Sequence, residues 1–322
     1  MKQMFLGSTA LVATTGLLFT GLSIEDIRNY ERSPVLEPLK PIEERATILF
    51  GGDLMFDRSI RLAMEAHGDD YIFSCIRDLL LGADLVVANL EGPITSHPSR
   101  SIGSKVGGAG NYTFTFPTST AELLARHNIR VVNIGNNHIL NFGREGVDET
   151  KQWLASAGVA YFGAPDPAEV SRIERVALRG IPFSFVNWND WDTTFAERVV
   201  AQTRDEVEAG RTVVVFAHWG EEYVSPPRRV RELAHSFVDA GASLVIGTHP
   251  HVVQEHEFYL PAGKAGEGVP IYYSLGNFVF DQYWDESVRR GLLVRATFTP
   301  KGGVSVEEIP IDNQTDRRTC AV

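Results

Sequence analysis

The sequence predicts an α/β fold with helices covering the sheets, and the alternation of two apolar patterns carries that prediction. Short apolar runs of strand length alternate along the chain with amphipathic stretches of helical spacing. The runs are apolar on both faces, which is typical of strands in sheets that are covered on both sides. Only a loop, 276–291, separates the last two runs, which indicates a mixed sheet with an antiparallel part near the carboxyl end.

The expected elements follow one another without an internal repeat. Strands are expected at 47–50, 85–88, 130–134, 183–187, 212–217, 243–246, 271–274 and 292–298. Helices are expected at 59–66, 71–81, 118–127, 147–157, 194–209 and 227–240.

The amino-terminal segment predicts export. Residues 4–24 contain no charged side chain, and this is about the length that crosses a bilayer as a helix. Lys2 precedes the segment and Glu25 and Asp26 follow it, so its amino terminus is expected inside. An uncleaved signal-anchor is predicted, with a cleaved signal peptide as the alternative. The first places the domain outside a membrane that the chain crosses once, and the second makes the protein secreted or periplasmic.

The rest of the chain divides by composition. The stretch after the apolar segment is charged and contains three prolines, which is typical of a stiff solvated spacer. The predicted parts are a signal-anchor or signal peptide (1–24), a proline-rich charged linker (25–45), one folded domain (46–312) and a polar tail (313–322).

Charge and cysteine content exclude two classes of function. The formal net charge is -11 and no block of lysine or arginine stands out, so a nucleic-acid partner is not expected. An acidic protein can still bind an anionic substrate if the site holds metal cations. The two cysteines form neither a disulfide framework nor a zinc–thiolate site by count. Cys75 is expected as a buried small side chain, and Cys320 as part of a mobile tail.

Polar residues follow six of the expected strands at their carboxyl ends, the edge where open α/β sheets bind ligands. One such residue is ordinarily a turn former or a helix cap. Turn chemistry does not call for histidine at three strand ends, however, so the joint pattern predicts a binding site. The residues at these ends are Asp53, Asn89, Glu91, Asn137, His138, His218, His249, His251 and Asn277.

These side chains have the ligand atoms that divalent cations prefer. Carboxylate and amide oxygens and imidazole nitrogens together can fill two adjacent metal sites that share a carboxylate. Two ions about 3.5–4 Å apart can clamp the attacking and leaving oxygens of a displacement and generate hydroxide at neutral pH. In the segment His249-Pro250-His251, an extended backbone would turn both imidazoles to the same side. We therefore expect one or two divalent ions, manganese(II) or iron(II).

Six motifs in this order resemble the bacterial capsule-synthesis protein CapA family, whose members are associated with poly-gamma-glutamate capsule production. That family is related to the calcineurin-like metallophosphoesterases. The resemblance covers roughly 46–296 and implies a four-layer α/β/β/α sandwich with mixed sheets and the site at the strand ends. The motifs are Phe-Gly-Gly-Asp-Leu-Met (50–55), Ala-Asn-Leu-Glu-Gly-Pro (88–93), Gly-Asn-Asn-His (135–138), Ala-His-Trp-Gly (217–220), Gly-Thr-His-Pro-His-Val-Val-Gln (247–254) and Ser-Leu-Gly-Asn-Phe-Val-Phe-Asp-Gln (274–282).

The resemblance also implies a role for each residue. The first metal would be held by Asp53 and His251, the second by Asn137, His218 and His249, with Glu91 bridging the two. His138 would act on the leaving group or orient the substrate.

Two positions depart from the related families. Met55 stands where phosphoesterases usually have a histidine, which weakens the first metal site, although CapA-like proteins generally share that difference. Asn141 stands where many CapA-like sequences have an aspartate; it can orient His138 but adds no negative charge. Arg58, just after the Asp53 turn, is a candidate to grip a phosphate or carboxylate, with a structural arginine as the alternative.

Two functions follow from this pattern. The first is a metal-dependent hydrolase that acts outside the membrane on a phosphoester or an amide-linked anionic polymer. The second is a non-catalytic accessory protein that binds metal or polymer during capsule assembly or export, with other capsule-synthesis subunits as partners. A large cluster of ionisable groups favours the enzyme, whereas Met55 and Asn141 favour the accessory role.

Overall fold

The computed structural model describes residues 45–163, 173–191, 196–263 and 266–322. The expected signal-anchor (1–24) and nearly all of the linker (25–45) lie outside these ranges. Within the described part of the chain, no helix has both the length and the apolar character needed to cross a bilayer.

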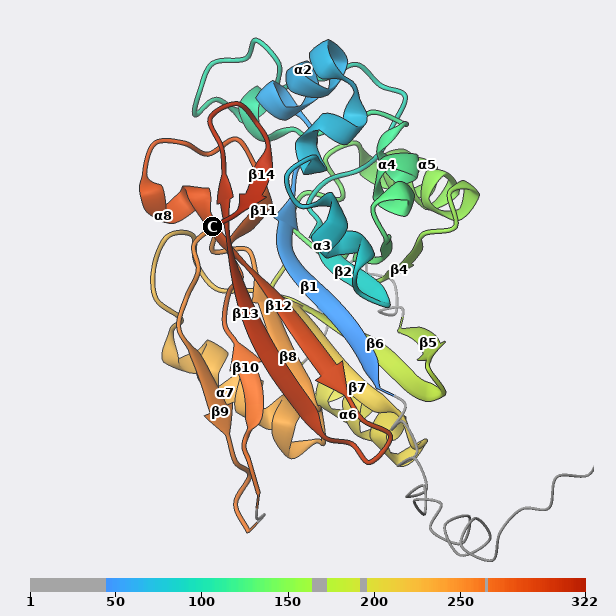
Figure 1. Ribbon diagram of the computed structural model, residues 1–322. Coiled ribbons are helices and arrows are strands. Elements are labelled where there is room, and N and C mark those ends of the chain that lie inside the picture. The colour runs from blue at the N-terminus through green and yellow to red at the C-terminus, as the bar shows by residue number, and fades with distance from the viewer. Residues whose placement is uncertain (1–44, 164–172, 192–195, 264–265) are drawn as a thin grey trace, which may run out of the picture. The chain divides into compact units, whose positions relative to one another are not determined.

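Two mixed sheets form the centre of the fold (Figure 1). The first has the order β14-β13-β12-β1-β2-β3-β4, with the short β11 beside β1, and the second has the order β5-β6-β7-β8-β10-β9. The strands of the first sheet are β1 (Ala46–Leu54), β2 (Leu85–Leu90), β3 (Ile129–Asn133), β4 (Ala160–Phe162), β11 (Asn277–Val279), β12 (Arg290–Phe298), β13 (Val304–Asn313) and β14 (Thr319–Ala321). The strands of the second sheet are β5 (Glu174–Leu178), β6 (Ile181–Asn189), β7 (Thr212–His218), β8 (Leu244–Thr248), β9 (His256–Tyr259) and β10 (Val269–Tyr272).

Both sheets combine parallel and antiparallel strands. In the first sheet β1 to β4 run parallel, and β12 to β14 add an antiparallel part on the other side of β1. In the second sheet β6, β7, β8 and β10 run parallel, and β5 and β9 are antiparallel edges. The mixed sheet predicted near the carboxyl end is therefore confirmed.

Helices cover the outer face of each sheet. Those on the first sheet are α2 (Arg58–His67), the 3-10 helices η1 (Asp69–Phe73) and η2 (Ala109–Tyr112), α3 (Arg77–Leu81), α4 (Thr120–Arg126) and α5 (Gly143–Ser156). Those on the second sheet are α6 (Ala196–Glu208) and α7 (Arg228–Asp239), and the short α8 (Glu286–Arg289) precedes β12. The sequence predicts one helix over 71–81 and only a loop over 276–291; the chain instead breaks the first with a turn at 74–76 and places β11 and α8 in the second.

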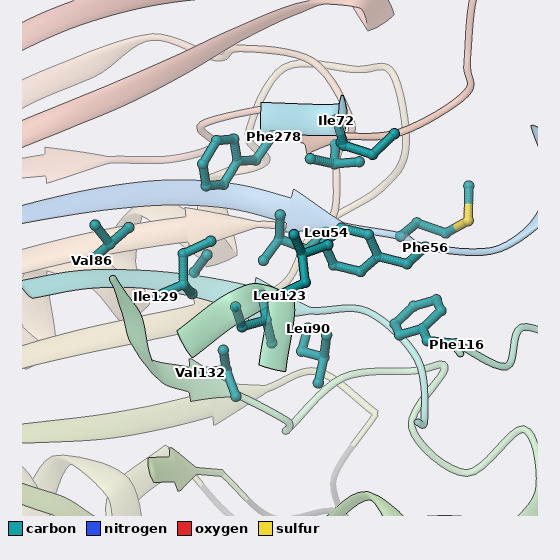
Figure 2. Close-up of a cluster of buried hydrophobic side chains, with 14 of the residues drawn as sticks. Leu54, Phe56, Ile72, Val86, Leu90, Phe116, Leu123, Ile129, Val132 and Phe278 are labelled. Atoms are coloured by element: carbon teal, nitrogen blue, oxygen red, sulfur yellow. The ribbon is translucent and has the colours of Figure 1, made fainter. Parts of the chain in front are cut away.

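Three apolar cores separate four layers. Leu49 of β1 packs toward the helices of the first sheet, in the cluster that Figure 2 shows with Val86 and Leu123. Its neighbour Phe50 points the other way, into the core between the two sheets. A third core joins the second sheet to α6 and α7. Because side chains alternate between the two faces of β1, this strand contributes to two cores. The predicted four-layer α/β/β/α arrangement is confirmed.

The carboxyl terminus differs from the prediction. The predicted tail forms the end of β13 and the whole of β14, which pair antiparallel. This pairing brings Cys320 to the turn after η1, where it forms a disulfide with Cys75 across a Cα–Cα distance of 4.9 Å. Cys75 is exposed in that turn and is not the buried apolar residue that the sequence predicts. The prediction is wrong because the two cysteines are 245 residues apart and meet only through strand pairing.

A close approach of β11 to β1 builds the edge at which the site lies. A Cβ atom on Gly52 would lie 1.8 Å from the carbonyl oxygen of Gly276, so only glycine fits there. The approach sets Asp53 of β1 beside Asn277 of β11 on one side and beside Asn89 of β2 on the other. Figure 1 shows β11 and β14 beside the end of β1.

Candidate metal centre

Glu91, just beyond β2, is the centre of the cluster. Its side chain is fully buried, and neither carboxylate oxygen has a hydrogen-bond partner among the described residues. Burial raises the pKa of Glu91 well above its usual range, and the nearby carboxylate of Asp53 raises it further. One oxygen, Oε1, faces three imidazole nitrogens, the Nε2 atoms of His251 at 3.7 Å, His218 at 3.9 Å and His138 at 4.0 Å.

His251 turns its Nε2 toward Glu91. Its Nδ1 lies 3.0 Å from Oδ1 of Asn277. The amide nitrogen of Asn277 donates to Gln282 Oε1 and to the carbonyl of Val288, both at 2.9 Å, so its Oδ1 is fixed as an acceptor. In the neutral ring, Nδ1 of His251 therefore carries the proton, and the Nε2 lone pair faces the Glu91 carboxylate.

His138 is held in the same tautomer by Asn141. Oδ1 of Asn141 accepts the backbone N–H of Phe114 at 2.7 Å and lies 3.2 Å from Nδ1 of His138. An oxygen that accepts from both donors leaves Nε2 of His138 unprotonated. Burial lowers the pKa of His138 to about 4 against the opposing effect of the Asn141 hydrogen bond, so the ring is neutral at physiological pH.

His218 links the cluster to Asn137. Its Nε2 lies 2.9 Å from Oδ1 of Asn137, and its Nδ1 lies 3.0 Å from the hydroxyl of Thr248. Burial lowers the pKa of His218 well below its usual value, and the charge of His249 lowers it further. The side of the ring that carries Nε2 therefore faces both Asn137 and Glu91.

Removing the Thr248 hydroxyl should weaken metal binding with little loss of fold. In Thr248→Val the ring of His218 loses a neighbour that orients it, and such changes behind a ligand cost roughly 10–100-fold in metal affinity. We expect the Mn²⁺ dissociation constant, measured by calorimetric titration, to rise by roughly tenfold or more. Thr203→Val, which removes a buried hydroxyl that bonds only within α6, is the matched control. An unchanged Mn²⁺ affinity in Thr248→Val would contradict the assignment of His218 as a ligand.

Two strained residues bring the remaining imidazoles together. His249 has φ 97° and His251 has φ 59°, a region that side chains with a Cβ rarely adopt. The extended segment that the sequence predicts for them is therefore wrong. The carboxylate of Asp53 holds the turn, since its Oδ2 accepts the backbone N–H of His249 at 3.1 Å. The Nδ1 of His249 is buried without a partner, and burial lowers the pKa of His249 to about 3.

Asp53 is ionised although it is fully buried. Burial alone would raise its pKa, but the hydrogen bond and charge of His251, with smaller effects of His218 and Asn89, lower the pKa of Asp53 to about 2. Nδ2 of Asn89 donates to Asp53 Oδ1 at 2.8 Å. The Asp53 carboxylate is thus available as a charged ligand and also supports the histidine turn.

The donor set fits a divalent cation. Buried acceptors without donors are costly, and this site gathers the carboxylate of Glu91, the Nδ1 of His249 and the Nε2 lone pair of His251. The ligand atoms of these three residues lie within 4.8 Å of one another. Carboxylate, amide and imidazole ligands suit manganese, iron or zinc. All six residues predicted as ligands lie in or directly beside this cluster, namely Asp53, Glu91, Asn137, His218, His249 and His251.

Met55 and Arg58 lie outside the ligand set. Met55 is fully buried in the core on the helix side, and its sulfur accepts the backbone N–H of Asp57 at 3.0 Å. The guanidinium of Arg58 pairs with Asp281 at 2.5 Å and stacks on the ring of Phe114, 5.1 Å from its centroid. The charge of Arg58 is therefore already neutralised by Asp281. The Phe114 ring that Arg58 stacks on also packs against the ring of His138, with centroids 4.5 Å apart.

Exposed aromatic rings border the cluster. Trp191, 42% exposed, lies with its ring centroid 4.3 Å from that of His249. On the other side a cavity of about 420 Å³ is lined by Arg58, Asn111, Tyr112, Tyr223, Gln282 and Trp284, among others. The ring of Tyr223 lies 6.0 Å from that of His251, so the cavity opens beside the cluster. The cavity therefore leaves room for a bound molecule next to the candidate metal site.

Sequence reasoning missed the residues that hold the ligands in place. Thr248, Asn133 and Asn136 were not singled out, although they complete the network around His218 and Asn89. Asn89 and Asn277 were found only as strand-end residues. The available signal was their position, since each is a polar residue in or next to an otherwise apolar strand.

Comparisons with known proteins agree with these motifs. The family model described as bacterial capsule synthesis protein PGA_cap matches residues 47–282. The capsule biosynthesis protein CapA of Bacillus anthracis is 27% identical over 305 residues, 88% of this chain and 72% of that protein. The PGA biosynthesis protein CapA of Bacillus subtilis is 30% identical over 280 residues, 82% and 70% of the two chains. A probable polyglutamine synthesis accessory protein of Mycobacterium tuberculosis is 30% identical over 181 residues, 47% and 45% of the two chains.

The matched region contains every residue of the candidate metal site. It begins at the second residue of β1 and ends at Gln282, which bonds the Asn277 side chain. The match covers most of the chain and includes all six strand ends from which the cluster is built. The chain therefore belongs to the bacterial capsule-synthesis protein family that includes the CapA proteins.

Proposed function

We propose that this CapA-like protein is a divalent-metal-dependent hydrolase of capsule or poly-gamma-glutamate biosynthesis. One observation carries the proposal, the buried Glu91 carboxylate without a donor that faces three imidazole nitrogens. A cation beside Glu91 would satisfy the carboxylate and the lone pairs together. Manganese(II) or iron(II) is the proposed ion, in one or two copies.

The proposed ligands form two sets, one for each ion. Asp53 and His251 would hold one ion, Asn137, His218 and His249 the other, and Glu91 both. When bound, the ions would act as Lewis acids and lower the pKa of a bound water.

The acid–base role falls to a residue beside the proposed ligands. His138 is held at Nδ1 by Asn141, which leaves its Nε2 free to hold a proton for the leaving group. Arg58, paired with Asp281, would position the aromatic wall beside His138 and would not carry substrate charge.

The proposed substrate is a phosphoester or an amide-linked anionic polymer. The ions would attract the anionic group to a site that has no unpaired cationic side chain among the residues lining the cavity. The cavity beside Tyr223 would take the part of the substrate that flanks the reacting bond. The name of the Bacillus subtilis relative, a PGA biosynthesis protein, supports a polymer of this kind.

The proposed location is outside the cytoplasmic membrane. Disulfides persist in oxidising compartments and are rare in the cytosol, so the Cys75–Cys320 bond supports export. The uncharged segment 4–24 is the proposed single-pass anchor, or a signal peptide if it is cleaved. Other capsule-synthesis subunits at the membrane are the proposed partners.

Metal content and turnover test the proposal together. The full chain is purified in detergent, its bound metal is measured, and phosphomonoester, phosphodiester and poly-gamma-glutamate substrates are assayed with added Mn²⁺. We expect at least one equivalent of metal and turnover of one substrate class, both lost in His249→Ala. Less than one equivalent of metal, no turnover and no effect of His249→Ala would refute the hydrolase.

A non-catalytic accessory role is the second candidate. The name of the Mycobacterium tuberculosis relative, an accessory protein of polyglutamine synthesis, favours it. This role predicts bound metal, lost in His249→Ala, without turnover of any of the three substrates. The same experiment therefore separates the two functions.

The residue at position 141 should change the kcat of the proposed hydrolase. In Asn141→Asp a carboxylate would accept the same two N–H groups and add a negative charge beside His138, which raises the pKa of that ring from about 4. If His138 protonates the leaving group, kcat at neutral pH should rise roughly tenfold, and Asn141→Leu should lower it by at least as much. A pH–rate profile checks both, because only a change at His138 moves the alkaline limb. Equal profiles in the three proteins would exclude His138 as the acid.

A further inference from the structure

The hairpin formed by β13 and β14 is bonded directly to β11. Nδ2 of Asn313 donates to the carbonyl of Asn277 at 3.1 Å, and Oδ1 of Asn313 accepts the backbone N–H of Phe280 at 3.2 Å. The hydroxyl of Thr319 donates to the carbonyl of Phe278 at 2.8 Å. These side chains are buried, so the bonds are not exchanged with water. The hairpin therefore helps to hold the short strand β11 in position, together with the pairing of β11 to β1.

Two successive hydrogen bonds connect this hairpin to a candidate metal ligand. Asn313 holds the backbone of Asn277, and the side chain of Asn277 holds His251 in the tautomer that faces Glu91. A shift of β11 would therefore move the acceptor that orients His251. Residues behind a ligand control metal affinity in this way.

The turn of the hairpin also contacts residues that line the cavity. Nε of Arg317 donates to the hydroxyl of Ser59 at 2.8 Å, and that hydroxyl donates to Asp281 at 2.9 Å. Asp281 is the partner of Arg58 in the cavity wall. One hairpin thus supports both the metal cluster and the wall of the cavity beside it.

The disulfide fixes the β14 arm of this hairpin. Cys320 lies in β14, a strand of three residues at the edge of the sheet, where so short a strand would otherwise fray. Its partner Cys75 follows η1, whose Phe73 ring packs 5.7 Å from the ring of Phe278 in β11. Figure 2 shows Phe278 close to Ile72 of the same helix. The disulfide therefore joins the η1 segment to β14, and the aromatic contact packs the same segment against β11.

We infer that Asn313 is a positioning residue for the metal ligand His251, and that the Cys75–Cys320 disulfide holds it in place. The inference rests on the proposed metal site. The hairpin lies entirely beyond residue 282, where the match to the family model ends. This chain therefore supports a family site with a segment outside the matched region.

We call Asn313 together with the Cys75–Cys320 disulfide the clamp. The test compares two variants of the clamp with a control variant that loses a buried hydrogen bond elsewhere in the fold. Asn313→Ala and the double variant Cys75→Ser/Cys320→Ser are prepared as full chains, with Ser184→Ala as control because Ser184 is a buried donor to Glu206 in the second sheet. Mn²⁺ affinity is measured by calorimetric titration. The tautomer of His251 in the metal-free protein is measured by long-range ¹H–¹⁵N NMR.

We expect both clamp variants to weaken Mn²⁺ binding roughly tenfold and to give His251 a mixture of tautomers. Ser184→Ala should lose stability but keep the affinity and the single tautomer. Affinity and tautomer unchanged in both clamp variants, or changed equally in the control, would overturn the inference. If the unaltered protein binds no Mn²⁺, the proposed function fails, and the tautomer measurement still decides the role of Asn313.

Discussion

Replacing Glu91 with glutamine should abolish metal binding and, in the same protein, stabilise the metal-free form. The glutamine has the same shape, but its amide can donate to the Nε2 atoms that now face an unpartnered carboxylate. Loss of the bridging charge should raise the Mn²⁺ dissociation constant by at least roughly 100-fold. Removal of the buried unsatisfied carboxylate should raise the free energy of unfolding of the metal-free protein by about 1–3 kcal/mol.

The pH dependence of this effect has a defined sign. The pKa of Glu91 is raised by folding, so its cost is absent below the pKa of the unfolded chain and grows as pH rises toward the folded pKa. The stability gain of Glu91→Gln over the unaltered protein should therefore be larger at pH 8 than at pH 5. Chemical denaturation with chelator present measures it. Glu65→Gln, at an exposed carboxylate of α2, is the control and should change neither property. A metal-free Glu91→Gln protein that is less stable than the unaltered one would contradict the proposed cation site.

Gly52→Ala should prevent the protein from folding stably. Its Cβ would lie 1.8 Å from the carbonyl oxygen of Gly276, and neither backbone can move without separating β1 from β11. Clashes between backbones in a packed sheet belong to the most destabilising class of substitutions, about 3 kcal/mol or more. We expect a large drop in the thermal midpoint of the metal-free protein, or no soluble protein at all.

The matched control for this change is Gly110→Ala. A Cβ at Gly110 meets its nearest atom at 3.5 Å, an ordinary contact, and this glycine does not have a positive φ. Its thermal midpoint should stay within a few degrees of that of the unaltered protein. A Gly52→Ala protein as stable as Gly110→Ala would show that β11 is not bound to β1 at this point.

The strand ends explain why so much of the site could be predicted. Asp53, Glu91 and His218 each follow an apolar run, and parallel strands deliver their carboxyl ends to one edge, so sequence order alone implies proximity. The backbone of the histidine turn could not be predicted, because the positive φ of His249 depends on a hydrogen bond to Asp53, 196 residues away.

The helical and apolar patterns likewise predicted sheets covered by helices but not the strands near residue 322. Residues 304–313 alternate in character and form a strand because β12 offers an edge, and the three residues 319–321 form a strand because β13 then offers the next edge. The Cys75–Cys320 bond follows from that pairing and not from the spacing of the cysteines. Local sequence determines local elements, whereas the hairpin is determined by a partner far away in the chain.

The positive φ angles of His249 and His251 have a consequence for laboratory evolution. Each strained residue costs of the order of 1–3 kcal/mol that glycine would not. A screen for heat resistance that ignores metal binding should therefore favour glycine at positions 249 and 251 and remove two of the imidazoles. Thermostable descendants that keep both histidines would be those in which function was selected at the same time.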